Sequence, residues 1–153
     1  KSVLHVNYIE LTKSNINIEM DEKSFEDIRV ISIENFVQQI LLVLIQNAKE
    51  SLNTLDLQGK EAFYKKMIHI AVTCEFGKVL IDISDGGGGI SKEVQETLFS
   101  EFKVSKKYQG SGIGLYFAKK LAKEKLLGDL TLHNSASPTT FRLMFPQYIS
   151  KKE

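Results

Sequence analysis

The sequence contains no tryptophan, only two prolines and a single cysteine among its 153 residues. One cysteine cannot form a disulfide within the chain, which excludes a fold held by internal disulfides and fits a reducing compartment. Cys74 stands in an alternating apolar stretch, so we expect it in the core rather than in a reactive site. The length and the 42% content of hydrophobic residues predict one domain over residues 1–153, with a sizeable core.

An excess of charge of either sign is also absent. Twenty Lys and Arg residues against 19 Asp and Glu residues give a formal net charge of +1, so the composition does not favour nucleic acid or an anionic membrane surface as a partner. No apolar run approaches the ~20 residues that cross a bilayer. The sequence begins at Lys1 without a signal-peptide pattern. We therefore expect a cytoplasmic piece of a longer protein, in which any tether to the inner membrane belongs to upstream segments.

Alternating apolar residues predict several strands separated by turn residues. The stretch Glu75-Phe76-Gly77-Lys78 lies between two such runs and predicts a β-hairpin. His69 alternates outward from its apolar neighbours and is expected to be solvated. The expected strands are the end of Val3–Met20, a short edge strand at Arg29–Ile31, the hairpin strands Ile68–Cys74 and Val79–Ile83, and two later strands at Asp129–His133 and Thr140–Phe145.

Apolar residues at helical spacing predict helices. Ser32 is a suitable N-cap for a long helix, and the polar stretch Asn53–Lys65 after it is expected to be a connection. Ser91 is a suitable N-cap for a short helix through Leu98. The apolar stripes are Phe36, Ile40, Val43, Leu44 and Ala48 in the long helix, and Leu115, Ala118, Leu121 and Ala122 in the last helix, whose Lys119, Lys120 and Lys123 are expected to face water.

Asn47 lies on the apolar stripe of the long helix. A buried amide without a partner costs roughly 1 to 3 kcal/mol. This asparagine therefore either caps a local carbonyl group or contacts a ligand, and the residue pattern alone leaves both interpretations open.

Four consecutive glycines follow Asp85, at the point where an apolar strand ends. Glycine has the largest backbone entropy cost on ordering, so such a run indicates positive φ angles or a close approach of the backbone to a ligand. The alternative is a flexible turn between the strand and the next helix. Asp85 stands at the start of this run.

A second glycine cluster, Gly110-Ser111-Gly112-Ile113-Gly114-Leu115, opens the last helix. A glycine-rich turn at a helix N-terminus presents free backbone N–H groups and the positive end of the helix dipole, which together suit phosphate. Before this cluster, Phe99 and Phe102 are expected to anchor the segment. The same segment contains three lysines, Lys103, Lys106 and Lys107. Two interpretations are open: they add positive charge near a ligand, or they belong to a solvated loop.

In order and spacing, the Asn47 helix, the Asp85 glycine run, the Phe99/Phe102 segment and the Gly110–Gly114 turn resemble four sequence boxes of a known family. They look like the N, G1, F and G2 boxes of the catalytic ATP-binding domain of bacterial sensor histidine kinases. That family shares its Bergerat ATP-binding fold with gyrase, mismatch-repair ATPases and heat-shock chaperones. The resemblance implies an α/β (α+β) two-layer sandwich, with a mixed sheet of about five strands and helices on one face.

The resemblance implies a role for each matching residue. Asn47 would ligate Mg²⁺ through its side-chain oxygen, and Asp85 would accept a hydrogen bond from the exocyclic amine of adenine, which selects ATP over GTP. Lys106 would be a lid lysine that acts with Asn47 in catalysis, and Thr140 would support the adenine pocket. The remaining nucleotide-binding residues would be Gly87, Gly89 and Ile90 near the base, and Gly110, Ser111, Gly112, Ile113, Gly114 and Leu115 near the phosphates.

The sequence departs from the family pattern at three positions, one of which is Thr139, in place of the usual glycine before the closing strand. Gly86 stands where the family usually has asparagine, which implies a looser turn and weaker nucleotide binding. Val43 lies four residues before Asn47, where ATPases of this fold have a catalytic glutamate. Valine can neither accept a proton nor hold a water molecule. Glu50 is the one nearby carboxylate that could substitute for it.

The resemblance implies a histidine kinase fragment that binds Mg-ATP and donates the γ-phosphoryl group to a histidine on an adjoining dimerisation domain, in two-component signalling. His5, His69 and His133 lack the sequence context of a phosphoacceptor, so the acceptor is expected upstream. The expected partners are that domain and a response regulator, with a monomeric fragment and a homodimeric full-length protein. The alternatives are an ATP hydrolase of the same fold, a kinase acting on serine, and a degenerate nucleotide-binding module that regulates a partner.

Overall fold

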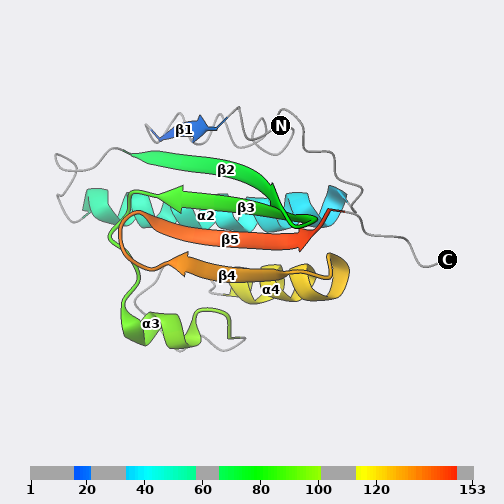
Figure 1. Cartoon of the computed structure of the whole chain (residues 1–153). Coiled ribbons are helices and arrows are strands. Elements are labelled where there is room, and N and C mark those ends of the chain that lie inside the picture. The colour runs from blue at the N-terminus through cyan, green and yellow to red at the C-terminus, as the bar shows by residue number, and fades with distance from the viewer. Residues whose placement is uncertain (1–15, 22–33, 58–65, 101–112, 148–153) are drawn as a thin grey trace.

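The computed structural model describes residues 16–21, 34–57, 66–100 and 113–147. They form a five-stranded sheet with the long helices α2 and α4 on one face (Figure 1). This confirms the expected two-layer architecture. In chain order the elements are β1 (Asn17–Met20), α2 (Glu34–Leu57), β2 (Met67–Glu75), β3 (Lys78–Asp85), α3 (Lys92–Thr97), α4 (Ile113–Lys125), β4 (Asp129–Asn134) and β5 (Thr139–Pro146).

The strands lie in the order β1-β2-β3-β5-β4. β1 pairs with β2 in parallel, and the other neighbouring strands pair antiparallel, so the sheet is mixed. The predicted hairpin is confirmed between β2 and β3. Its two turn residues, Phe76 and Gly77, both have positive φ, at 50° and 73°, as the type I′ hairpin turn requires. In the strand order given above, β3 is the central strand. The glycine run follows directly after its C-terminal end.

The hydrophobic core lies between the helices and the sheet. Both predicted helical stripes contribute to it, although Phe36, Val43 and Leu121 are only partly buried. Each fully buried aliphatic or aromatic side chain contributes about 1.5 to 3 kcal/mol. The buried side chains include Ile40, Leu44, Ala48 and Leu52 of α2, Leu115, Ala118 and Ala122 of α4, and Ile68, Ile70, Ile81, Ile83, Leu143 and Phe145 of the sheet.

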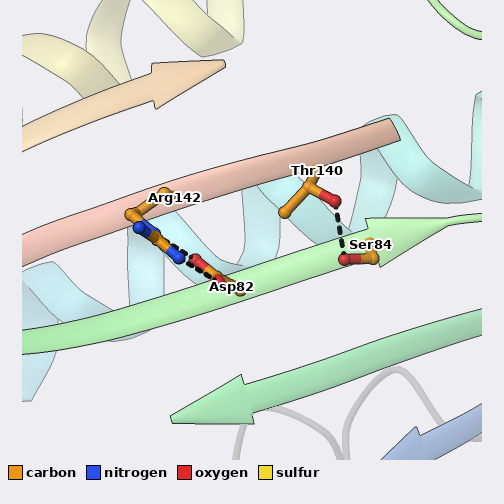
Figure 2. Close-up of polar contacts among 4 residues, drawn as sticks. All are labelled: Asp82, Ser84, Thr140 and Arg142. Atoms are coloured by element: carbon orange, nitrogen blue, oxygen red, sulfur yellow. Dashed lines mark hydrogen bonds and ion pairs between the residues drawn. The ribbon is translucent and has the colours of Figure 1, made fainter. Parts of the chain in front are cut away.

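The opposite face of the sheet carries polar side chains, because alternate residues of a strand point to opposite faces. Figure 2 shows two cross-strand pairs between β3 and β5. Arg142 donates two hydrogen bonds to Asp82, at 2.8 and 2.7 Å, and the hydroxyls of Ser84 and Thr140 lie 2.9 Å apart. The hydrogen bonds that Arg142 donates to Asp82 raise the pKa of Arg142 above its usual range. These pairs fix the register of the two strands.

Three expectations from the sequence are wrong. The helix α2 continues to Leu57, past the expected end at Asn53, because Leu52 and Leu55 extend its buried stripe. Cys74 is exposed, because the alternating burial of β2 ends at Val72 and the last residues of the strand belong to the exposed hairpin end. Its thiol lies 3.4 Å from Gln147 Oε1.

The third wrong expectation concerns Lys119, whose side chain is only partly exposed and is held by neighbouring groups. Its Nζ donates to the carbonyl of Leu130 at 2.8 Å, pairs with Asp129 at 3.0 Å and lies 4.6 Å from the centre of the Phe99 ring. Its helix neighbours Lys120 and Lys123 are exposed, as expected. Lys119 thus links α4 to β4 and to the residues that follow α3.

Several predicted features lie outside the described residues, namely the edge strand Arg29–Ile31, Ser32, Phe102, Lys103, Lys106, Lys107, Gly110, Ser111 and Gly112. Within the described part, no helix combines the length and apolar character that a membrane span requires.

Candidate functional site

The site is built around Asp85, the last residue of β3, whose side chain is only 4% exposed. One carboxylate oxygen, Oδ1, accepts a hydrogen bond from Ser51 Oγ of α2 at 3.0 Å and another from the backbone N–H of Gly87 at 2.9 Å. The other oxygen, Oδ2, accepts none from the described residues. A buried carboxylate with one saturated and one open oxygen is suited to accept a hydrogen bond from a ligand.

Burial raises the pKa of Asp85 to about 6, and the hydrogen bonds from Gly87 and Ser51 oppose this rise. The ordinary value is 3.8. No charged neighbour contributes to the shift among the residues described. The pKa therefore reports a carboxylate that is costly to keep ionised in the free protein, and such groups cluster at functional sites.

The glycines after Asp85 meet two distinct steric demands. A Cβ at Gly87 would collide with Ser51 Oγ and with Asp85 Oδ1, so only glycine fits against this pair. Gly89 has φ +81°, and a Cβ there would lie 2.9 Å from the carbonyl oxygen of Ser135. The adjacent N–H of Ile90 donates to this same oxygen at 2.8 Å. The glycine run is thus held against the β4–β5 connection and is not a free turn.

Asn47 lies one helical turn before Ser51 on α2, so both side chains share a face of that helix. The Nδ2 of Asn47 is buried and has no acceptor among the described residues. The possibility that Asn47 caps a local carbonyl group is therefore not realised in this part of the chain. A buried amide left unpaired costs about 1 to 3 kcal/mol, which is consistent with a site that a ligand completes.

Thr139 provides a second buried polar atom without a partner. It lies opposite Asp85 in the register of β3 and β5, so both side chains point to the same face of the sheet. Its Oγ1 is buried and makes no hydrogen bond with the described residues. Thr140, which we expected to support the pocket, instead pairs with Ser84 on the polar face of the sheet.

The first turn of α4 approaches α2 near Asn47. A Cβ at Gly114 would lie 3.2 Å from Val43 Cγ1, so glycine permits the two helices to pack closely one turn before Asn47. Ile113 is exposed and Leu115 is buried in the core. The first N–H groups of a helix have no partner within the helix, so the start of α4 can present donors near the Asn47 turn.

Two residues near Asn47 bear on hydrolysis. Val43 contacts the start of α4, so its position is taken by helix packing. The carboxylate of Glu50 accepts a hydrogen bond from Gln46 Nε2 at 3.1 Å. Within the part of the chain that the structure describes, no group of three or more His, Cys, Asp or Glu residues could hold a metal ion.

Of the residues predicted from the sequence, the structure brings Asp85, Gly87, Gly89 and Ile90 together at the end of β3. Asn47, Gly114 and Leu115 lie on the two helices that meet near this end. Sequence reasoning did not place Ser51 or Thr139 in the site. The spacing of Ser51, four residues after Asn47, was an available signal, because it places both on one helix face.

Comparison with known proteins identifies the family. Residues 32–149 match the family described as histidine kinase-, DNA gyrase B- and HSP90-like ATPase. The chain belongs to this family.

Individual relatives indicate a more specific class of protein than the family as a whole. The chain is 32% identical over 107 residues to the C4-dicarboxylate transport sensor protein DctB of Rhizobium meliloti, covering 69% of this chain and 15% of DctB. It is 28% identical over 151 residues to the signal transduction histidine-protein kinase ArlS of Staphylococcus haemolyticus, covering 93% of this chain and 28% of ArlS. The chain thus spans less than a third of the length of either relative.

The catalytic domain of histidine kinase ThkA in a nucleotide-free form has a similar fold, with a TM-score of 0.76, 26% identity, and coverage of 96% of this chain and 89% of that domain. Together these similarities confirm the recognised class, a catalytic ATP-binding domain of the sensor histidine kinase type.

Proposed function

We propose that this chain binds Mg-ATP and donates the γ-phosphoryl group to a histidine on an adjoining dimerisation domain. The observation that supports this most is the buried Asp85 carboxylate, with Oδ1 saturated by Ser51 and Gly87 and Oδ2 open. An ionised carboxylate is only an acceptor. It matches the exocyclic amine of adenine and repels the carbonyl oxygen that guanine has at the same edge.

The metal is proposed to bind at Asn47. The side-chain amide of Asn47 has a buried Nδ2 without a partner among the described residues, and a hard cation such as Mg²⁺ would bind this amide through its oxygen. One protein oxygen together with phosphate and water oxygens fits the way this ion is usually held. When bound, Mg²⁺ would neutralise charge that develops on the phosphates during transfer.

The phosphates are proposed to lie at the start of α4. Gly114 brings this helix end against α2 one turn before Asn47. Of the residues outside the described part, Gly110, Ser111 and Gly112 are proposed to donate backbone N–H groups to the phosphates, and Lys106 to contact the γ-phosphate. In the reaction, a histidine nitrogen forms a bond to the γ-phosphorus, the bond from this phosphorus to the β-γ bridging oxygen breaks, and ADP leaves.

A response regulator is proposed as a partner of this chain. The histidine kinase ThkA, whose structure covers 95% of this chain at 24% identity, is known in complex with the response regulator TrrA. We infer that the parent of this chain signals to a response regulator in the cytoplasm. The fragment is proposed to be monomeric and the full-length protein homodimeric, with the dimerisation domain upstream.

An ATP hydrolase of the same fold finds less support. Val43 occupies the position of the expected catalytic glutamate and packs against α4, and Glu50 is engaged with Gln46. Neither arrangement offers a base that would orient water toward the γ-phosphate. We therefore expect slow hydrolysis by the chain alone.

The test combines calorimetric titration with phosphotransfer. Mg²⁺ with a non-hydrolysable ATP analogue should bind, and Mg-GTP should bind far more weakly. With γ-labelled ATP, the chain alone should not become labelled, and the parent's upstream helical hairpin added in trans should. Robust multiple turnover by the chain alone, lost in Glu50→Gln, would instead establish the hydrolase.

A further inference from the structure

Ser51 and Gly87 converge on the same oxygen of Asp85. Ser51 Oγ lies 3.0 Å from Oδ1 and the Gly87 nitrogen lies 2.9 Å from it. Two donors on one oxygen fix the rotation of the carboxylate about its last side-chain bond. The second oxygen, Oδ2, is then the only one left for a ligand among the described contacts.

The three residues form a tightly fitted unit. A Cβ on Gly87 would collide with both Ser51 Oγ and Asp85 Oδ1, so the serine hydroxyl fills the space that a side chain at position 87 would need. Ser51 comes from α2 and Asp85 from β3, which are 34 positions apart in the sequence. The hydroxyl is thus a specific bridge between the helix layer and the end of the central strand.

We propose that Ser51 is a positioning residue for nucleotide selection, holding the Asp85 carboxylate so that Oδ2 is reserved for the exocyclic amine of adenine. This inference rests on the proposed function and deepens it, because it names a determinant of base specificity that lies outside the glycine-rich segment.

A second effect follows from the same hydrogen bond. Burial raises the pKa of Asp85 to about 6, while the hydrogen bonds from Gly87 and Ser51 favour the ionised form. The groups of the described residues that face Asp85 are uncharged, namely Ser51 from α2, Ile68 from β2, Thr139 from β5 and Gly87 from its own loop. His69, next to Ile68, pairs with Ser84 and lies on the other face of the sheet.

The consequence for specificity depends on protonation. A protonated carboxyl group gains a donor, so it no longer rejects the carbonyl oxygen of guanine. Without Ser51, Asp85 would become protonated at a higher pH. ATP affinity would then fall at a higher pH than in the wild type, and discrimination against GTP would weaken in the same range.

The experiment measures the affinity for Mg-ADP and Mg-GDP between pH 5 and pH 8 in the wild type, Ser51→Ala and the control Ser84→Ala. Ser84 also makes a hydroxyl hydrogen bond on β3 but on the opposite face. In Ser51→Ala the acid limb of ADP binding should move upward by about one pH unit, a change equivalent to about tenfold in affinity. Ser84→Ala should keep the wild-type profile, and Ser51→Thr, which retains the hydroxyl, should restore it.

Two further measurements separate this inference from the proposed function. In the Asp85→Asn background, Ser51→Ala should cause no shift of the acid limb, because no carboxylate remains to titrate. In the nucleotide-free protein, carbon NMR should show the Asp85 carboxyl titrating at a higher pH in Ser51→Ala. An unchanged Asp85 titration would overturn the role of Ser51, whereas a wild type that binds no adenine nucleotide would overturn the proposed function.

Discussion

Thr139 lies directly opposite Asp85 in the register of β5 and β3, and its hydroxyl is buried without a partner among the described residues. Its neighbour Thr140 points to the other face and pairs with Ser84. Two adjacent threonines thus have opposite hydrogen-bonding states in the free protein.

This contrast gives a matched pair of substitutions. Thr139→Val removes an unpaired buried hydroxyl, so it should stabilise the free protein, by about 1 kcal/mol, and should weaken nucleotide binding if the hydroxyl contacts the ligand. Thr140→Val leaves Ser84 without its partner and should destabilise the protein by a similar amount. Thermal unfolding of both variants measures the difference. Equal effects of the same sign would contradict the assigned faces.

Asp85 should reduce the stability of the free protein at neutral pH. The pKa of Asp85 in the folded protein, about 6, lies above the ordinary 3.8. The folded protein is therefore most stable, as far as this group is concerned, below about pH 4, where the carboxyl is protonated, and this stability is lost as the pH rises through 6. The difference corresponds to a cost of up to about 3 kcal/mol at pH 7. Asp85→Asn keeps an acceptor for Ser51 and Gly87 but cannot ionise, so it should raise the free energy of unfolding at pH 7.

The same variant should lose affinity for ATP by roughly 1.5 to 3 kcal/mol, the usual contribution of a hydrogen bond to a charged group. Urea unfolding at pH 4 and pH 7, with calorimetry in parallel, tests both effects. The stabilisation should be small at pH 4 and larger at pH 7. A folded Asp85→Asn protein with unchanged ATP affinity would remove Asp85 from the site.

Substitution of Asn47 should separate folding from chemistry. Asn47 Nδ2 has no acceptor among the described residues, so Asn47→Ala should change the free energy of unfolding by less than about 1 kcal/mol. Phosphoryl transfer to the upstream domain should be abolished, as it should be by chelation of Mg²⁺ in the wild type. Parallel unfolding and labelling assays test this. Transfer that survives in Asn47→Ala would place the metal elsewhere.

Lys119 should stabilise the junction between α4, β4 and the residues after α3. Its charge contacts the Asp129 carboxylate, the Leu130 carbonyl and the face of the Phe99 ring. Lys119→Met retains most of the side-chain stem and removes the charge, so it should cost about 1 to 2 kcal/mol. Lys120→Met, at an exposed position of the same helix, is the control and should be nearly neutral.

The pH dependence of this pair is opposite to that of Asp85. Burial alone would raise the pKa of Asp129, but the hydrogen bonds from Lys119 and Leu130 and the charge of nearby lysines lower it. The stabilisation of the folded protein by the Lys119–Asp129 ion pair is therefore present above about pH 4, and it is lost as the pH falls through the lowered pKa of Asp129. The difference in unfolding free energy between the wild type and Lys119→Met should shrink in acid. A difference that is constant down to pH 2 would exclude the ion pair as its source.

The main outline of the fold and several residues of the site could be predicted from local patterns. The hairpin was readable from Phe76-Gly77 between two apolar runs, and Asp85 was conspicuous at the start of four glycines. Ser51 was less evident. Its spacing from Asn47 places it on the same helix face, but its contact with Asp85 follows only from the placement of α2 against the end of β3. The choice between Thr139 and Thr140 likewise depends on register with a strand far away in the sequence, which local alternation does not determine.

The exposure of Cys74 and of Lys119 could not be predicted from local patterns either. Cys74 continues the alternation of β2, yet it is exposed at the hairpin end. Of the three α4 lysines that were expected to face water, Lys119 is the one that forms an ion pair with Asp129 and lies over the Phe99 ring. This follows from the packing of α4 on its neighbours rather than from helical periodicity.

The alternation of side chains along β3 has a consequence for how this strand can vary. Asp82 and Ser84 bind β5 on one face, while Asp85 contacts Ser51 on the other. A substitution at Asp82 can therefore alter stability without touching the proposed nucleotide site. Insertion or deletion of a single residue between Asp82 and Asp85 would exchange the two faces, turning one carboxylate away from its partner. The length of this segment is thus more tightly constrained than the identity of Asp82 or Ser84, the two residues on the face of the sheet opposite the helices.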